Sequence, residues 1–201
     1  MSVEIHGTVS EGWEPIHEKL VSNFHSLGEL GASICITFEG ETVVDLWAGE
    51  SDTLGNPWNE DTIAVVNSCT KGAVALACHL LADRGLLDLD APVSEVWPEF
   101  AHGTKAAITN RMMLNHTTGV AAFREELPQG AAFDWDYMCD RVAAEEPWWS
   151  PGTRNGYHLM SFGWVAGELV RRASGKSLGT FFKEDVAEPS GADFWIGLPP
   201  E

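Results

Sequence analysis

The chain has 201 residues, with 12 Lys and Arg against 30 Asp and Glu, which gives a formal net charge of −18 at pH 7. Its hydrophobic content of 44% and charged content of 21% are those of a globular protein, and its length suits one domain. The acidic balance argues against nucleic acid and anionic membranes as partners, because their phosphates attract clustered positive charge.

No stretch has the length of a transmembrane helix, since the most apolar one covers residues 73–82 and roughly twenty residues are needed. The N-terminus lacks the basic and apolar runs of a signal peptide, so a cytoplasmic location is expected. The cysteines form no Cys-x-x-Cys pair, and we expect reduced core residues. Without a His-Glu-x-x-His motif, neither a metal nor a cofactor is predicted.

The first half of the chain predicts a helix, a hairpin and a second helix. Apolar residues recur at three- and four-residue spacing between residues 13 and 27, which predicts an amphipathic helix over about 14–26. Alternation from Ile34 and a turn at Glu39-Gly40-Glu41 predict a β-hairpin over about 32–47. The nearly all-apolar stretch at 73–82 predicts a helix that is buried on most sides and covers a sheet.

The second half predicts a helical region over about 84–190. Its expected helices are a short one near 111–115, one capped by Asp134 and running to about 146, one over 161–173 and one over 177–186. Residues 194–201 resemble the beginning of a strand. Because a lone hairpin is marginally stable, we expect further strands beyond Glu201, supplied by a C-terminal half or by a second copy of the chain.

One pair of residues has the spacing of a serine hydrolase site. Ser68-Cys69-Thr70-Lys71 contains the chain's single Ser-x-x-Lys and opens the apolar helix, whereas no Gly-x-Ser-x-Gly of an α/β-hydrolase occurs. A spacing of three places both side chains on one face, where the ammonium can reach the hydroxyl. The positive end of the helix dipole favours the oxyanion of acyl transfer. The alternative is a surface helix cap with an extended lysine.

Further stretches accompany this pair in order along the chain. They are Asp-Leu-Trp-Ala-Gly at 45–49, Pro-Trp-Asn-Glu-Asp-Thr at 57–62, Ala-Asp-Arg-Gly-Leu-Leu-Asp-Leu-Asp-Ala-Pro-Val at 82–93 and Met-Leu-Asn-His-Thr-Thr-Gly-Val at 113–120. Over about residues 28–197 the chain resembles the serine hydrolases related to class C β-lactamases and penicillin-binding proteins. The resemblance implies an α/β (α+β) fold of the β-lactamase and DD-peptidase type, in which an antiparallel sheet flanked by helices accompanies a helical region. Residues 1–201 would then be the N-terminal portion of one such domain, without its C-terminal strands.

The resemblance also implies a catalytic tyrosine after a Pro-Gly turn. Of the two tyrosines, Tyr137 and Tyr157, the second follows the Pro-Gly at 151–152. The resemblance therefore assigns Ser68 as the nucleophile, Lys71 as the base and Tyr157 as its partner. The alternative for Tyr157 is a packed aromatic ring with its hydroxyl on a backbone carbonyl.

Two departures from the family pattern bear on the substrate. The β-lactamase pattern has Tyr-x-Asn, whereas this chain reads Tyr157-His158-Leu159, and no Ser-Asp-Asn occurs. The missing amide favours a carboxylesterase over a β-lactamase or peptidase. The chain also lacks a Lys-Thr-Gly or His-x-Gly strand, which in the family supplies one wall of the site and the second oxyanion amide.

Other conspicuous side chains have structural explanations. Asn115 and His116 precede a turn ended by Gly119, and we expect the imidazole to bond to the backbone. Most tryptophans are expected in the core, with the Trp148-Trp149 pair as an alternative lining for an acyl pocket.

The sequence therefore predicts a serine hydrolase that cleaves small carboxylic esters through an acyl-enzyme on Ser68, without a cofactor. Two alternatives stay open: hydrolysis of β-lactams or D-alanyl peptides by the same residues, and a truncated or degenerate relative without catalysis. If strands are missing, residues 1–201 alone are expected to be aggregated, molten or bound to a partner, and inactive.

Overall fold

The computed structural model describes residues 3–198, and the chain divides between Ala64 and Val65 into two compact units. We call residues before the division the sheet unit and those after it the helical unit. Within the described range, no helix combines the length and the apolar character needed to cross a membrane.

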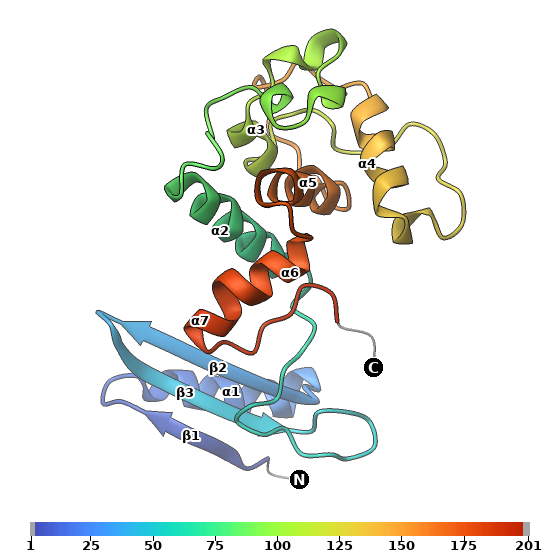
Figure 1. Ribbon diagram of the computed structural model, residues 1–201. Helices are drawn as coiled ribbons and strands as arrows, with labels where there is room; N and C mark the ends of the chain where they lie inside the picture. The colour runs from blue at the N-terminus through green and yellow to red at the C-terminus, as the bar shows by residue number, and fades with distance from the viewer. Residues whose placement is uncertain (1–2, 199–201) are drawn as a thin grey trace. The chain divides into compact units, whose positions relative to one another are not determined.

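The sheet unit is a three-stranded antiparallel sheet with one helix packed against it (Figure 1). Its elements are β1 (Ile5–Val9), α1 (Glu14–Leu27), β2 (Gly31–Phe38) and β3 (Glu41–Gly49), with the strands in the order β1-β3-β2. Leu20 from α1 is buried with Val44 and Leu46 from β3, which form the centre of this unit's core. The amphipathic helix predicted over 14–26 is confirmed.

The predicted hairpin is also confirmed, and its turn is short. Phe38 pairs with Glu41, so Glu39 and Gly40 alone connect β2 to β3. Both have positive φ, 51° and 89°, which is the geometry of a type I′ turn whose twist matches that of the strands. The register of the hairpin is therefore set locally by this turn.

The prediction of two strands was incomplete, because β1 adds a third. It pairs with the edge of β3 that a lone hairpin would leave open, matching Ile5 with Ala48 and Val9 with Val44. At its centre, a Cβ on Gly7 would lie 1.9 Å from the carbonyl oxygen of Asp45, so only glycine allows this pairing. Strand β1 has little apolar alternation, and its partner lies far along the chain, so local pattern did not reveal it.

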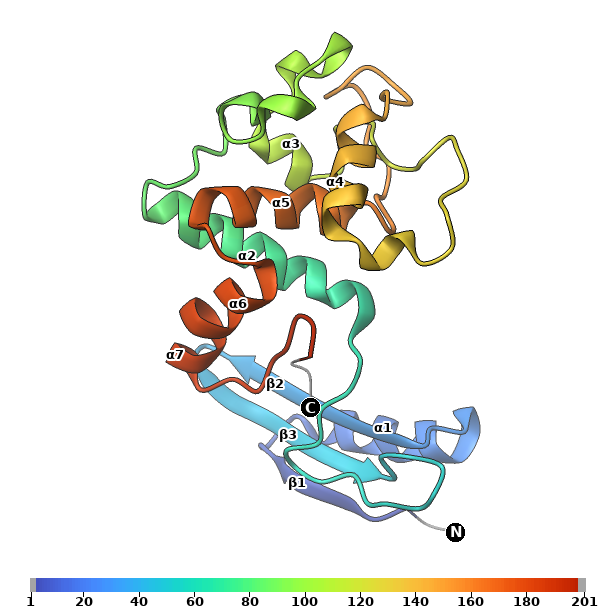
Figure 2. The same cartoon turned by 45° about the vertical axis from the view of Figure 1, so that its right-hand side comes forward.

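The helical unit has two hydrophobic cores that share one helix. Its helices are α2 (Thr70–Asp83), α3 (Asn110–Leu114), α4 (Trp135–Ala144), α5 (Phe162–Ser174), α6 (Leu178–Phe182) and α7 (Glu188–Ser190), with a wide π turn at Lys183–Ala187. Phe162, Ala166 and Val170 of α5 join the core that contains α2 and α6. Val165 and Leu169 of α5 join the core that contains α3 and α4. Figures 1 and 2 show α2 and α5 side by side.

The helices predicted in this unit are confirmed, including the Asp134 cap, whose carboxylate accepts the Tyr137 N–H at 3.0 Å. The expectation for α2 needs correction, because its buried residues pack with α5 and α6, and Leu76 on its surface is 52% exposed. The alanines of α2 make its sequence apolar on every face, although the helix packs mainly through one face. The sequence therefore overestimated how much of α2 is buried.

The strand predicted from residue 194 is absent from the part of the chain that the structure describes, which ends at residue 198. Phe194 instead packs on Phe182, with ring centroids 5.2 Å apart. The carbonyl of Ile196 lies against Gly179, where a Cβ would be 2.3 Å away. This segment makes side-chain contacts with the helical unit in place of a strand's ladder of backbone hydrogen bonds.

The cysteines are all free thiols, and all lie in the described range. Cys78 and Cys139 are buried as expected, but Cys35 and Cys69 are exposed, so their assignment to the core was wrong. Side chains alternate along β2, so Cys35 lies on the opposite face from its two isoleucine neighbours.

A buried carboxylate joins α5 to α4. Glu168 has no exposed surface, and its oxygens accept from Arg171 and from Arg172 at 2.7 Å and from the Trp135 indole at 2.8 Å. Burial raises the pKa of Glu168, but these hydrogen bonds outweigh it and lower the pKa to about 2. The carboxylate therefore stays ionised inside the unit.

Glu168→Gln should destabilise the helical unit by about 1 to 3 kcal/mol at neutral pH, because Arg171 loses its close carboxylate partner and Arg172 keeps only Glu99. The wild-type stabilisation is complete above the unfolded pKa of about 4.3 and is lost as the pH falls towards the folded pKa of about 2. Urea unfolding at a series of pH values measures the difference. Glu125→Gln is the control, since its surface bridge to Arg141 should cost less than about 1 kcal/mol. Equal losses in both variants would contradict the role of Glu168.

Candidate active site

The helical unit brings the predicted nucleophile and base together at the start of α2. Ser68 lies in a 3₁₀ turn, Asn67–Cys69, that leads into the helix, and its side chain is exposed. Asn67 has a φ of 46°, a left-handed conformation that Asn tolerates better than most residues. The Lys71 ammonium donates to Ser68 Oγ at 3.0 Å, as the spacing of three predicts.

Two further contacts fix the Lys71 ammonium. It donates to the backbone carbonyl of Leu159 at 3.2 Å, and it lies 4.9 Å from the centre of the Tyr157 ring. Beneath it, the buried Phe162 ring at the start of α5 is 5.7 Å away. The cation therefore links the first turn of α2 to the segment that enters α5.

Tyr157 completes this group. Hydrogen bonds with Ser68 and then with Lys71 lower the pKa of the Tyr157 phenol, and the Lys71 charge acts in the same direction. The side chain is 51% exposed, so it faces solvent as well as the other two residues. Tyr137, the other tyrosine, lies on α4, where its backbone N–H bonds to Asp134. The structure thus brings together the three residues that the sequence assigned, whose catalytic roles stay predictions.

The contact with the Leu159 carbonyl was not predicted. In the family pattern, an asparagine side chain occupies this position, and the sequence shows only its replacement by leucine. Because a main-chain carbonyl occurs at every residue, no sequence signal could show that this one would bind Lys71.

His116 makes a hydrogen bond to the backbone, as expected from the sequence. Its Nδ1 accepts the backbone N–H of His158 at 3.2 Å, directly after Tyr157. Burial, followed by the charge of Lys71, lowers the pKa of His116. Asn115 is also structural, since its carbonyl accepts from the Asn155 side chain at 2.6 Å.

The tryptophan pair has two different surroundings. Trp148 is 51% exposed and stacks under the Arg124 guanidinium at 4.2 Å. Trp149 packs against Gly156, where an added Cβ would lie 2.3 Å from the indole. Trp149 therefore supports the backbone just before Tyr157.

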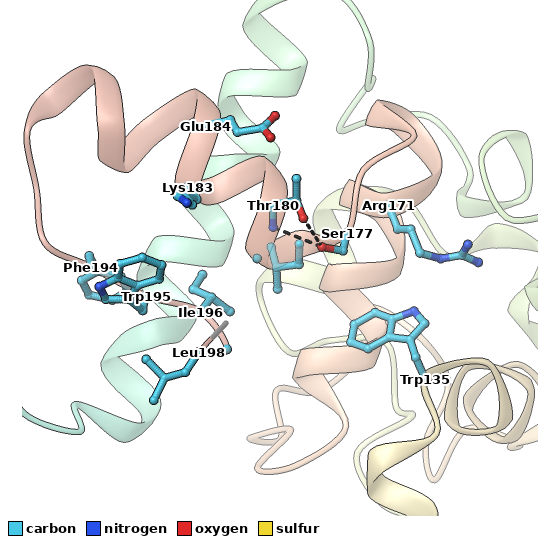
Figure 3. Close-up of a pocket in the computed structure, with 13 residues that line it drawn as sticks. Trp135, Arg171, Ser177, Thr180, Lys183, Glu184, Phe194, Trp195, Ile196 and Leu198 are labelled. Carbon is cyan, nitrogen blue, oxygen red and sulfur yellow. Dashed lines mark hydrogen bonds between the residues drawn. The ribbon is translucent and has the colours of Figure 1, made fainter. Parts of the chain in front are cut away.

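A separate cavity of about 720 Å³ lies between α4, α6 and the segment at residues 194–198. Figure 3 shows Trp135 on one side of it, with Phe194 and Trp195 on the other. Ser177 faces this cavity, but its hydroxyl donates to Thr180 Oγ1 at 2.8 Å and accepts the Thr180 N–H, which caps α6. None of the three candidate catalytic residues lines this cavity.

Comparison with known proteins identifies the class to which this fold and site belong. Residues 16–201 match the family described as Beta-lactamase, and the chain belongs to the beta-lactamase family. It is similar to the crystal structure of a family VIII carboxylesterase, with a TM-score of 0.89 and 42% identity, covering 98% of this chain and 55% of that one. A penicillin-binding protein homologue from Caulobacter crescentus gives a TM-score of 0.92 and 40% identity, with 98% and 53% covered. The predicted fold class is confirmed.

Curated relatives include named esterases. The chain is 38% identical over 172 residues to the esterase/beta-lactamase LipL of Mycobacterium tuberculosis, covering 85% of this chain and 40% of LipL. It is 33% identical over 183 residues to the esterase EstB of Burkholderia gladioli, covering 81% of this chain and 45% of EstB. The chain therefore spans about half the length of the relatives it matches, and it is homologous to esterases of the beta-lactamase family.

The contact between Lys71 and Tyr157 can be measured directly, because Tyr137→Phe leaves a single phenol. In that background, Lys71→Met should raise the pKa of Tyr157, since the ammonium stabilises the phenolate. Ultraviolet absorbance of the tyrosinate during an alkaline titration reports the shift. Lys183→Met, whose ammonium lies near Glu188 and the Trp195 ring, is the control and should leave Tyr157 unchanged. Equal pKa values in the two variants would contradict the geometry of the site.

Proposed function

We propose that this site hydrolyses small carboxylic esters through an acyl-enzyme on Ser68. The observation that carries the proposal is the convergence of the Ser68 hydroxyl with the Lys71 ammonium at 3.0 Å and of that ammonium with the Tyr157 ring, whose centre is 4.9 Å away. A nucleophile beside groups that can accept its proton is the signature of covalent catalysis. No cofactor enters the reaction.

In acylation, Ser68 Oγ attacks the ester carbonyl and forms the new C–O bond. The sequence assigned the base to Lys71, but its ammonium donates to Ser68 Oγ in the structure. We therefore propose that the proton of the hydroxyl passes to the Tyr157 phenolate, whose charge the ammonium stabilises. The carbonyl becomes a tetrahedral oxyanion. When it collapses, the bond to the alcohol breaks, and the proton held by Tyr157 passes to the leaving oxygen.

Deacylation repeats these steps with water. A water molecule gives its proton to the pair formed by Lys71 and Tyr157 as its oxygen attacks the acyl carbonyl. The bond to Ser68 Oγ then breaks, the serine regains a proton, and the acid leaves. The backbone N–H of Ser68, at the start of α2, supplies one donor to the oxyanion in both steps.

The preference for esters is supported by the segment after Tyr157. Leu159 stands where the β-lactamase pattern has an asparagine, and its side chain is 62% exposed. A side chain without hydrogen-bonding groups favours an ester over a substrate whose amide needs a partner. Two relatives named esterases and a structure named a family VIII carboxylesterase agree with this choice. Hydrolysis of β-lactams is the second candidate, which the full name of LipL favours.

A fluorophosphonate should label Ser68, because it phosphorylates an activated serine without requiring turnover. The labelling is measured by peptide mapping of the 201-residue chain. Ser68→Ala should abolish the adduct. The matched control is Ser190→Ala, a serine whose hydroxyl bonds to its own helix at the Val186 carbonyl and which should leave labelling unchanged. An adduct on another serine would rule out the assignment.

Substrate class is tested by comparing kcat/KM for a short p-nitrophenyl ester and for a chromogenic cephalosporin. We expect the ester to react at least about tenfold faster, because the amide of the β-lactam side chain has no partner at Leu159. Leu159→Asn should lower the ratio of the ester kcat/KM to the cephalosporin kcat/KM, because the asparagine side chain offers a partner to the amide of the β-lactam. Met160→Leu, at the adjacent exposed position, should leave this ratio unchanged. A higher kcat/KM for the cephalosporin would reverse the ranking.

A further inference from the structure

We propose that His116 is the positioning residue of this site: it clamps the backbone on both sides of Tyr157 and so holds the phenol against Lys71. The inference rests on the proposed function and deepens it, because it assigns a role to a residue that does not itself react. His116 touches neither the ester nor Ser68 in this scheme, and it acts through Tyr157.

The clamp consists of two hydrogen bonds from one residue. The carbonyl oxygen of His116 accepts the N–H of Gly156 at 3.1 Å, and its imidazole Nδ1 accepts the N–H of His158 at 3.2 Å. These N–H groups belong to the residues on either side of Tyr157. Residues 154–158 form no helix or strand, so the clamp replaces the hydrogen bonds that regular structure would supply.

The ring of His116 also packs against the Tyr157 ring. Its centroid lies 5.0 Å from that of Tyr157 and 5.1 Å from that of the buried Phe162. Phe162 in turn lies 5.7 Å from the Lys71 ammonium. The phenol and the ammonium are therefore set against a continuous aromatic surface, which limits where the hydroxyl can point.

His158 supports the clamp from inside the unit. Its side chain is fully buried, with Nδ1 at 2.6 Å from the Gly156 carbonyl and Nε2 at 2.7 Å from Thr118 Oγ1. Since a carbonyl can only accept, Nδ1 carries the proton, and Nε2 accepts from the threonine hydroxyl. The bond from His158 to the Gly156 carbonyl spans Tyr157, and the bond to Thr118 anchors the His158 ring. Together they fix the two peptide groups that His116 also binds.

The clamp requires a neutral His116, because a protonated Nδ1 cannot accept the N–H of His158. The titratable groups that face His116 are Lys71 from α2 and Tyr157 and His158 from the loop, while α5 presents only Phe162. Burial first, and then the positive charge of Lys71, lowers the pKa of His116. The Lys71 ammonium therefore also helps to keep the His116 imidazole neutral, so that Nδ1 can accept the His158 N–H.

The backbone of His116 offers independent support. Its φ is 64°, a left-handed conformation that His adopts less readily than Gly or Asn. The position would be more relaxed with glycine, which has no imidazole to accept the bond. A His in this conformation is explained if its Nδ1 acceptor is needed.

The test compares two substitutions in the Tyr137→Phe background, where Tyr157 is the one phenol that titrates. His116→Gly suits the left-handed backbone but removes both acceptor and ring, so the pKa of Tyr157 should rise towards its ordinary value of about 10 as the phenol leaves Lys71. In His116→Asn, Oδ1 takes the place of Nδ1 and the conformation is tolerated, so the pKa of Tyr157 should stay low. Far-ultraviolet circular dichroism verifies folding of both variants.

An unchanged pKa of Tyr157 in His116→Gly would overturn the proposal, as would an equal rise in both variants. A measurement on the unaltered chain does not depend on any variant folding: nitrogen NMR should show His116 Nδ1 unprotonated at neutral pH, and a protonated Nδ1 there would also overturn it. Neither readout involves ester turnover. Failure of the fluorophosphonate to label Ser68 would therefore count against the proposed function alone, and failure of these titrations against the clamp alone.

Discussion

The burial of α5 on two sides is the constraint on which the helical unit depends. Residues from one side of α5 pack with α2 and α6, and residues from the other side pack with α3 and α4. Ser68 and Lys71 lie at the start of α2, and Tyr157 lies on the segment that enters α5. Placing α5 against α2 therefore places both halves of the site. In the Glu168 network, the hydrogen bond from the Trp135 indole joins α5 to α4, while the bonds from Arg171 and Arg172 lie within α5.

Within the site, the Lys71 ammonium contacts or influences each of the other polar groups. The Lys71 ammonium bonds to a hydroxyl and a carbonyl, and its charge lowers the pKa of both Tyr157 and His116. For the phenol this favours the charged base, and for the imidazole it favours the neutral acceptor. Because the Leu159 carbonyl belongs to the main chain, it can hold the ammonium whichever side chain stands at that position. The leucine at position 159 therefore leaves Lys71 its main-chain partner.

The sequence predicted those features that have a local cause. Apolar periodicity predicted α1, the Asp134 side chain predicted where α4 begins, and a Ser-x-x-Lys spacing predicted the contact between Ser68 and Lys71. Tyr157 required the family resemblance, because spacing alone does not connect it to α2. Strand β1 was missed because only its distant partner β3 defines it. The His116 clamp was foreseen only as a backbone bond, since nothing in the sequence shows which N–H the imidazole would meet.

Nucleophile activation and oxyanion stabilisation are separable in the proposed mechanism. Ser68, Lys71 and Tyr157 all belong to the helical unit, so one unit positions the groups that are proposed to move the proton. The family resemblance assigns the second oxyanion amide to a Lys-Thr-Gly or His-x-Gly strand, and the 201 residues contain neither motif. Loss of one oxyanion donor typically costs about 100- to 1000-fold in turnover. A phosphonate brings a strong electrophile of its own and depends less on such donors. Labelling of Ser68 and ester turnover therefore test different parts of the proposed site.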